Sequence, residues 1–253
     1  MNRTTLHQRR LLRAAILGCA VLTSAVCVNP LGANPSRSPE KSIMKEQPLT
    51  LKQLAIAPIA ANAAIGDMPR LHDALNRGLD AGLSLSETKE ILVQLYAYAG
   101  FPRSLNALSL LMNVVEERAA RGIEDAPGRE PGPVPSGYAL TELGTDNQTR
   151  LVGAPVSGPL FEFAPAIDQF LKVHLFGDIF ARDNLQWTDR ELATVGALAA
   201  MAGVESQLES HLKISLNVGM TVEQLRQVAQ ELEARGDLQA AQRVSAGLDR
   251  IRR

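Results

Sequence analysis

Apolar residues recur at helical spacing over most of the chain from position 50 onward. In one segment, five small or apolar residues fall at i, i+3, i+4, i+7 and i+8 and share one helix face: Leu71, Ala74, Leu75, Gly78 and Leu79. Comparable faces lie at 84–98, 105–115, 190–201, 208–216, 221–232 and 238–251. Because few β-branched runs interrupt them, these periods predict an all-α fold.

Helix starts are marked by Ser or Thr followed three positions later by Glu or Gln, the arrangement of a capping box. This pattern predicts helices that begin after Thr50, Ser84, Thr188 and Thr221. We expect Asp67 to cap a further helix and Pro58 to kink or delay the first one.

The range 122–159 differs from the rest, because seven glycines and six prolines fall in it without a sustained helical period. We interpret it as a linker or as an extended arm that packs on a neighbour. On either side the order of helices is similar, and residues 102 positions apart match at Ile65 and Ile167, His72 and His174, Leu83 and Leu185, Val93 and Val195, and Ala97 and Ala199. We therefore expect two diverged helical repeats, at 49–121 and at 160–253, the second with an added C-terminal helix.

The N-terminus has the composition of a secretory leader. Four arginines lie within the first 13 residues and precede an uncharged run from 14 to 28. We expect residues 1–33 to be a signal peptide, 34–48 to be a disordered lead-in, and the mature protein to be periplasmic or secreted. The alternatives are a membrane anchor, for which the run is short, and lipidation at Cys19.

Removal of this leader changes the chemistry that the chain can offer. Both cysteines, Cys19 and Cys27, lie inside it, so the mature chain has no thiol. It retains 22 basic and 27 acidic residues, a net charge of −5, and no basic patch, so nucleic acid is not expected as a partner. No permanent membrane span is expected, and the three remaining histidines lack metal-ligand spacing, so we expect no metal.

Two segments resemble the carboxymuconolactone decarboxylase family. The first is 83–108, which ends in Tyr-Ala-Gly-Phe-Pro-Arg-Ser-Leu-Asn-Ala-Leu. The second combines Arg-Glu-Leu-Ala at 190–193, Ala-Gly at 202–203 and Ser-His-Leu at 210–212. The resemblance extends over most of the mature chain. It implies a tandem repeat of the all-α, usually oligomeric, alkylhydroperoxidase-D-like fold.

The peroxidase branch of that superfamily uses a Cys-x-x-Cys pair with a Glu before it and a His four residues after it. Here His211 matches the His and Glu191 approximately matches the Glu, whereas the cysteine positions hold Val204 and Gln207. Peroxide reduction by that route is excluded, because neither residue forms a thiolate. The decarboxylase branch needs no cysteine and no cofactor. The resemblance then implies that His211 carries a proton and that Glu191 orients it or relays the proton.

Ordinary structural roles could explain the same residues. Glu191 is the third residue of a predicted capped helix, and His211 lies beside an apolar stripe against which it could simply pack. Gln94 and Tyr98 are four residues apart on one helix and could line a substrate pocket with Asn106. They could equally pack in the core while Asn106 caps a helix.

Two functions are consistent with these patterns. The first is a cofactor-free lyase or related acid/base enzyme that acts on a small carboxylated or lactone substrate. The second is a non-catalytic binding or assembly protein that kept the fold. The missing cysteines and the single motif histidine favour the second function, as does Lys89, which stands where the other repeat has Glu191. In both cases the family resemblance implies a homo-oligomer.

Overall fold

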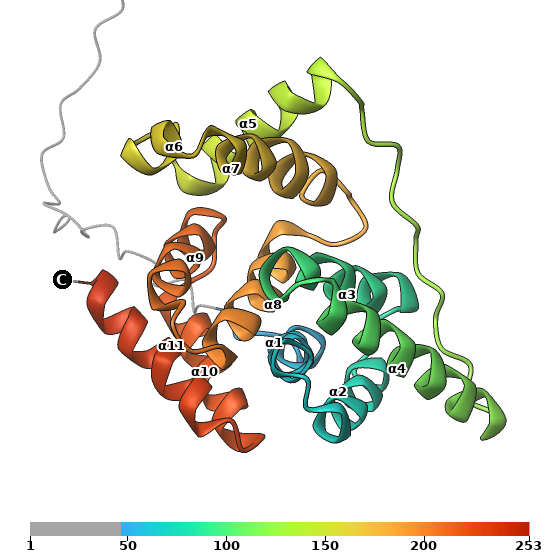
Figure 1. Ribbon diagram of the computed structural model, residues 1–253. Coiled ribbons are helices and arrows are strands. Elements are labelled where there is room, and N and C mark those ends of the chain that lie inside the picture. The colour runs from blue at the N-terminus through green and yellow to red at the C-terminus, as the bar shows by residue number, and fades with distance from the viewer. Residues whose placement is uncertain (1–46, 253) are drawn as a thin grey trace, which may run out of the picture. The chain divides into compact units, whose positions relative to one another are not determined.

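A computed structural model describes residues 47–252, and within this range every regular element is helical, which confirms the predicted all-α fold. In chain order (Figure 1) the elements are α1 (Leu51–Ile65), α2 (Met68–Asp80), α3 (Leu85–Ala99), α4 (Phe101–Ala120), α5 (Tyr138–Val152), α6 (Pro159–Phe163), α7 (Pro165–Phe170), the π-helix η1 (Leu171–Ile179), α8 (Trp187–Ala200), α9 (Glu205–Asn217), α10 (Val222–Ala234) and α11 (Leu238–Ile251). None of these helices combines the length and the apolar character needed to cross a membrane. The expected signal peptide, both cysteines and nearly all of the lead-in lie outside the described residues.

Three of the four predicted capping boxes are present in full. The side chains of Thr50, Ser84 and Thr221 each accept a hydrogen bond from the backbone amide three residues later, and the Glu or Gln at that position bonds back. Asp67 caps α2 as predicted. The fourth prediction, at Thr188, is wrong, because α8 begins at Trp187, two residues earlier than predicted, and no side chain caps it.

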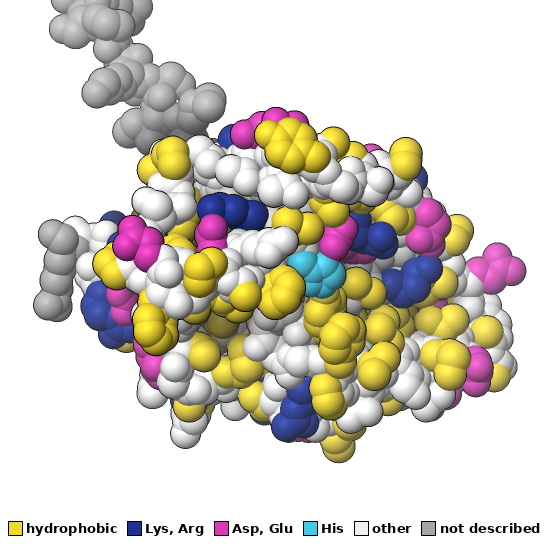
Figure 2. Space-filling model, turned by 45° about the horizontal axis from the view of Figure 1, so that its top comes forward, with side chains coloured by type: hydrophobic (Ala, Val, Ile, Leu, Met, Phe, Trp, Pro, Cys, Tyr) yellow, Lys and Arg dark blue, Asp and Glu magenta, His cyan; other side chains and the backbone are white. Residues whose placement is uncertain are grey.

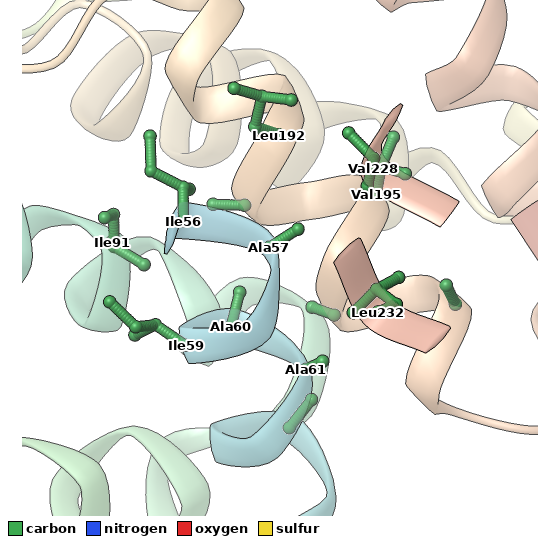
Figure 3. Packing of buried hydrophobic residues seen from close by; sticks show 14 of the residues in the cluster. Ile56, Ala57, Ile59, Ala60, Ala61, Ile91, Leu192, Val195, Val228 and Leu232 are labelled. Atoms are coloured by element: carbon green, nitrogen blue, oxygen red, sulfur yellow. The ribbon is translucent and has the colours of Figure 1, made fainter. Parts of the chain in front are cut away.

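Helix α1 lies at the centre of the main hydrophobic core. Its residues Ile56–Ala64 are all buried, and α8 is its most extensive packing partner. The close approach depends on Gly196 of α8, because a Cβ atom at this position would collide with the backbone of Ala57. On the other side of α1, Ile59 points toward Ile91 of α3 (Figure 3). Small residues on one side and branched residues on the other thus fix α1 between the two parts of the chain.

Pro58 neither delays nor ends α1, contrary to one expectation from the sequence. The helix begins at Leu51 and continues through the proline to Ile65. The Asn62 side chain donates to the Pro58 carbonyl oxygen at 2.8 Å and so provides a further local hydrogen bond at this point of the helix.

A second, smaller layer is formed by α5, α6, α7 and η1, which lie together at the top of Figure 1. It has its own hydrophobic cluster, consisting of Leu151, Leu175, Phe176, Ile179, Phe180 and, from α9, Ile214. Gly144 allows α5 to pack closely on η1, since a Cβ atom there would collide with the carbonyl oxygen of Lys172. The expectation that 122–159 lacks a helix is therefore wrong for 138–152. The density of glycine and proline hides the apolar period of α5.

The segment 123–136 connects the two layers without regular structure, and it crosses the start of α3. The Leu85 amide donates to the Ala126 carbonyl oxygen at 2.9 Å. Further along, the Gly132 amide donates to Oδ1 of Asp183 at 2.8 Å. These contacts hold the segment against the start of α3 and against Asp183 of the same chain.

The two expected repeats share one core. Helices α3 and α8 begin at Leu85 and Trp187, which are 102 positions apart, and a further helix follows each of them. Buried apolar residues of α1–α4 and of α8–α11 belong to the same hydrophobic cluster. The duplication remains an interpretation of the sequence, with helix order consistent with it.

Candidate functional site

Helices α8 and α9 bring a glutamate and a histidine into contact in the interior. Nδ1 of His211 lies 2.8 Å from Oε2 of Glu191. Glu191 is 0% exposed and His211 is 8% exposed. Because an ionised carboxylate only accepts hydrogen bonds, Nδ1 of His211 is the donor in this pair. In the neutral imidazole, Nε2 then holds the free lone pair that a general base requires.

The Glu191 side chain is hydrogen-bonded to His211 and does not cap the start of α8. Since Gln186 is the N-cap residue of α8, Glu191 is not part of a capping box, and that alternative reading of the sequence is wrong. Its second oxygen, Oε1, is buried and has no hydrogen-bond partner among residues 47–252. Burial of a carboxylate with a single partner is unfavourable. A role that depends on His211 therefore accounts for Glu191 better than helix capping.

Tyr98 at the end of α3 packs its ring against the imidazole. The two ring centres are 5.5 Å apart and the planes meet at 81°, an edge-to-face contact. The hydroxyl oxygen of Tyr98 is buried, and burial together with the negative charge of Glu191 raises the pKa of this phenol well above its ordinary value. Tyr98 is thus an uncharged side chain whose ring packs against the imidazole of His211 and limits its movement.

A cavity of about 530 Å³ lies beside the histidine, between the small layer and α9. Its described lining is predominantly apolar and comes from α3, α5, α6, η1, α8, α9 and the loops between them: Ala97, Tyr98, Gln148, Val152, Val156, Phe161, Leu171, Leu175, Phe176, Leu198, Val204, Gln207, Ser210, His211, Lys213 and Ile214. The volume is within the range of small-molecule sites. Leu171, Leu175 and Phe176 of the π-helix η1 line the cavity. Turns of π-helix are often found at functional sites.

The other residues expected in a substrate pocket lie elsewhere. Gln94 is buried and donates to the Arg190 carbonyl oxygen at 2.9 Å and to the Thr194 hydroxyl at 2.8 Å. It is not among the residues that line the cavity beside His211. Asn106 is exposed on α4 and also lies outside this lining. Of the three expected substrate contacts, the structure brings only Tyr98 to His211.

Gln94 belongs to a buried polar network between α3 and α8. Arg190 donates to Oε1 of Glu90 at 2.8 Å and to Oε1 of Gln94 at 3.0 Å, and all three side chains are almost completely buried. Arg182 adds a second cation on Glu90, with Nε at 3.0 Å from both carboxylate oxygens. The carboxyl group is surrounded by donors, so this network links the two helices that carry Tyr98 and Glu191.

Gln148 of α5 is the polar residue that sequence reasoning missed. It is 3% exposed and it lines the cavity. Its neighbour Asn147 donates to the Phe176 carbonyl oxygen at 2.9 Å, which fixes this turn of α5 on η1. The apolar period through Leu140 and Leu151 is the only sequence signal that could have placed Gln148 on a helix.

The other two described histidines occupy surface positions. His72 lies 2.9 Å from a carboxylate oxygen of Glu117, and His174 lies 2.6 Å from one of Asp178. Among residues 47–252 no group of three or more His, Cys, Asp or Glu side chains is arranged to hold a metal ion.

The first half of the chain carries no second acid/base pair at the matching positions. Lys89, in the position of Glu191, forms an ion pair with Glu130 at 2.8 Å on the surface, and Leu108, in the position of His211, packs against the main core. Each chain therefore has one Glu–His pair of this kind within the described range.

These features define an all-α protein with a buried Glu–His pair at the wall of an apolar cavity. Residues 165–249, from α7 to α11, match the model of the Carboxymuconolactone decarboxylase family. No curated protein matches the chain.

The positions that correspond to the motif cysteines can now be located in the fold. The positions of the peroxidase cysteines, Val204 and Gln207, both line the cavity beside His211. Apolar and amide side chains thus occupy the place where the peroxidase branch carries its thiols. The cavity and the histidine are present, but thiol chemistry at these two positions is excluded.

Proposed function

We propose that the protein is a cofactor-free acid/base enzyme of the lyase type that acts on a small carboxylated or lactone substrate. The observation that carries this proposal is the buried Glu191–His211 pair at the wall of a cavity large enough for such a molecule. A structural histidine would need neither a buried carboxylate with an unpartnered oxygen nor a place on a cavity wall.

In the proposed reaction His211 transfers the proton. When the bond between the substrate and its carboxylate breaks, carbon dioxide leaves and the electron pair stays on the substrate as an enolate. His211 enters this step as the imidazolium, delivers its Nε2 proton to that carbon and regains a proton from solvent after the product leaves. Glu191 stabilises the charged imidazolium and fixes its orientation. The apolar walls keep water away from the enolate until it is protonated.

A non-catalytic binding protein is the second candidate. The predominantly apolar lining and the absence of a matching buried Glu–His pair among residues 47–121 favour it. Under this function the cavity binds the same type of molecule, and His211 only donates or accepts a hydrogen bond. We further propose that the mature protein is exported and acts as a homo-oligomer, as the leader-like N-terminus and the family resemblance suggest.

The test is a turnover screen with small lactones and carboxylated lactones, followed by His211→Gln. We expect this variant to lose about 10²–10⁴-fold in kcat/KM while its melting temperature changes little, because a positioned acid or base contributes that much. Glu191→Gln should lose less, since the amide oxygen can still accept from Nδ1.

His174→Gln is the matched control, because this histidine is exposed and lies outside the cavity lining. It should retain the activity of the unmodified protein. Full activity in a folded His211→Gln protein would reject the catalytic role and favour the binding protein.

A further inference from the structure

The cavity beside His211 has little charge with which to hold a polyacid. Among its described lining residues Lys213 is the one side chain with a full charge, and it is exposed. The remaining walls are mostly aliphatic or aromatic. A substrate with several carboxylates would lose its hydration here without gaining compensating cations, which is strongly unfavourable. The lining instead fits a molecule with an apolar body.

One polar group is available deep in these walls. Gln148 is 3% exposed and lines the cavity from α5. Because Gln148 lines the cavity, its side-chain NH2 group can donate a hydrogen bond to a ligand that is bound there. The close packing of α5 on η1 through Gly144 and the bond from Asn147 to Phe176 hold this side chain at the wall.

We propose that the ligand is a lactone that carries an apolar chain or ring, and that the Gln148 amide donates a hydrogen bond to its carbonyl oxygen. The lactone head rests on the proposed function, whereas the apolar body follows from the lining. Gln148 and His211 line the same cavity from α5 and α9. During turnover the carbonyl oxygen gains negative charge, so a fixed amide donor would stabilise the enolate as His211 protonates it.

The experiment measures binding, not turnover, by isothermal titration calorimetry on the leader-free protein. The ligands are γ-decalactone, γ-butyrolactone as the head without an apolar body, and citrate as a polyacid. Gln148→Met removes the amide and keeps the length of the side chain, and Gln239→Leu on the exposed side of α11 is the control for surface polarity. A second cavity variant, Leu171→Trp, fills the site from η1.

We expect γ-decalactone to bind with a Kd at least 10-fold lower than that of γ-butyrolactone, and citrate to give no saturable signal. Gln148→Met should weaken γ-decalactone binding about 10-fold, the usual effect of one lost hydrogen bond, and Leu171→Trp should weaken it further. Gln239→Leu should bind like the unmodified protein.

Three results would overturn the proposal: tighter binding of citrate than of γ-decalactone, no binding of γ-decalactone, or unchanged γ-decalactone binding in a folded Gln148→Met protein. If Gln148→Met fails to fold, the ligand series and Leu171→Trp still decide. Loss of the lyase proposal alone, seen as full turnover in His211→Gln, leaves these binding results intact, so the two failures are distinguishable.

Discussion

Arg190 shows how a single buried charge depends on its neighbours. Burial lowers the pKa of its guanidinium, and the carboxylate of Glu90 opposes this effect. Removing one partner from a buried ion pair leaves the other charge uncompensated, which is far more unfavourable than the loss of a surface pair. The stability of the α3–α8 contact therefore depends on Glu90 more than on any exposed carboxylate nearby.

We expect Glu90→Gln to lower the free energy of unfolding by about 3–5 kcal/mol, because Arg190 and Arg182 then face each other without a carboxylate. Urea denaturation followed by circular dichroism measures this change. Glu130→Gln, at the exposed partner of Lys89, is the control and should have no measurable effect. Equal midpoints for the two variants would mean that Glu90 is not the residue that stabilises Arg190.

At the residue scale, the sequence predicted the chemical pair but not its surroundings. Glu191 and His211 could be paired because they match the motif glutamate and histidine, Glu191 only approximately, and the hydrogen bond between them agrees with that pairing. Helical spacing correctly put Gln94 and Tyr98 near each other, yet it cannot tell which neighbouring helix each side chain meets. Gln148 had no motif at all, since its contacts form only when α5 packs on η1.

Among the elements, α1 and α8 pack with their backbones close together at Gly196 and Ala57. Alanine at a helical glycine normally stabilises a helix by about 1 kcal/mol. At Gly196 the opposite should occur, because the added Cβ atom meets the backbone of Ala57, which cannot move without shifting α1. We expect Gly196→Ala to reduce stability by about 1–3 kcal/mol, measured as a lower Tm.

Gly247→Ala on α11 is the matched control for this prediction. Its Cβ atom would come within 2.7 Å of Cδ1 of Leu212, the end of a flexible side chain that can rotate away. Its loss of stability should be clearly smaller. A Gly196→Ala protein as stable as the unmodified one would show that α1 and α8 tolerate a wider separation than the core suggests.

Local signals predicted those helix starts that depend on local hydrogen bonds. The boxes at Thr50, Ser84 and Thr221 succeeded because each closes within four residues. Thr188 failed because tertiary contacts moved the start of α8. The indole of Trp187 donates to the Phe180 carbonyl oxygen at 3.1 Å. This bond holds Trp187 in place as the first residue of α8, before the predicted cap at Thr188. This contact reaches back beyond the four residues of a capping box, so no capping pattern contains it.

At the scale of the whole molecule, one helix presents apolar side chains to solvent. Phe101, Leu105 and Met112 of α4 are each more than half exposed, and their spacing puts them on one stripe. Figure 2, in which the top of Figure 1 is turned forward, shows further hydrophobic side chains spread over the visible face. Apolar surface of this kind is typical of protein contacts.

We therefore expect the leader-free protein to be a homo-oligomer in which the α4 stripe is buried. Light scattering after size exclusion should give a multiple of the single-chain mass at micromolar concentration. Leu105→Glu should shift that mass toward a single chain, whereas Leu238→Glu, at an exposed leucine of α11, should not. A single-chain mass for the unmodified protein would contradict the expectation.

The position of α1 has a consequence for how this chain can evolve. Although α1 belongs to the N-terminal half, it is enclosed by α2 and α3 on its own side and by α8 and α10 on the other. A gene fragment that encodes only the family-matched region, 165–249, would leave the apolar surface of α8 without its main partner. Neither half can therefore be exchanged as an independent module. A mutation that changes the cavity in one half is acceptable only if it remains compatible with the residues of the other half.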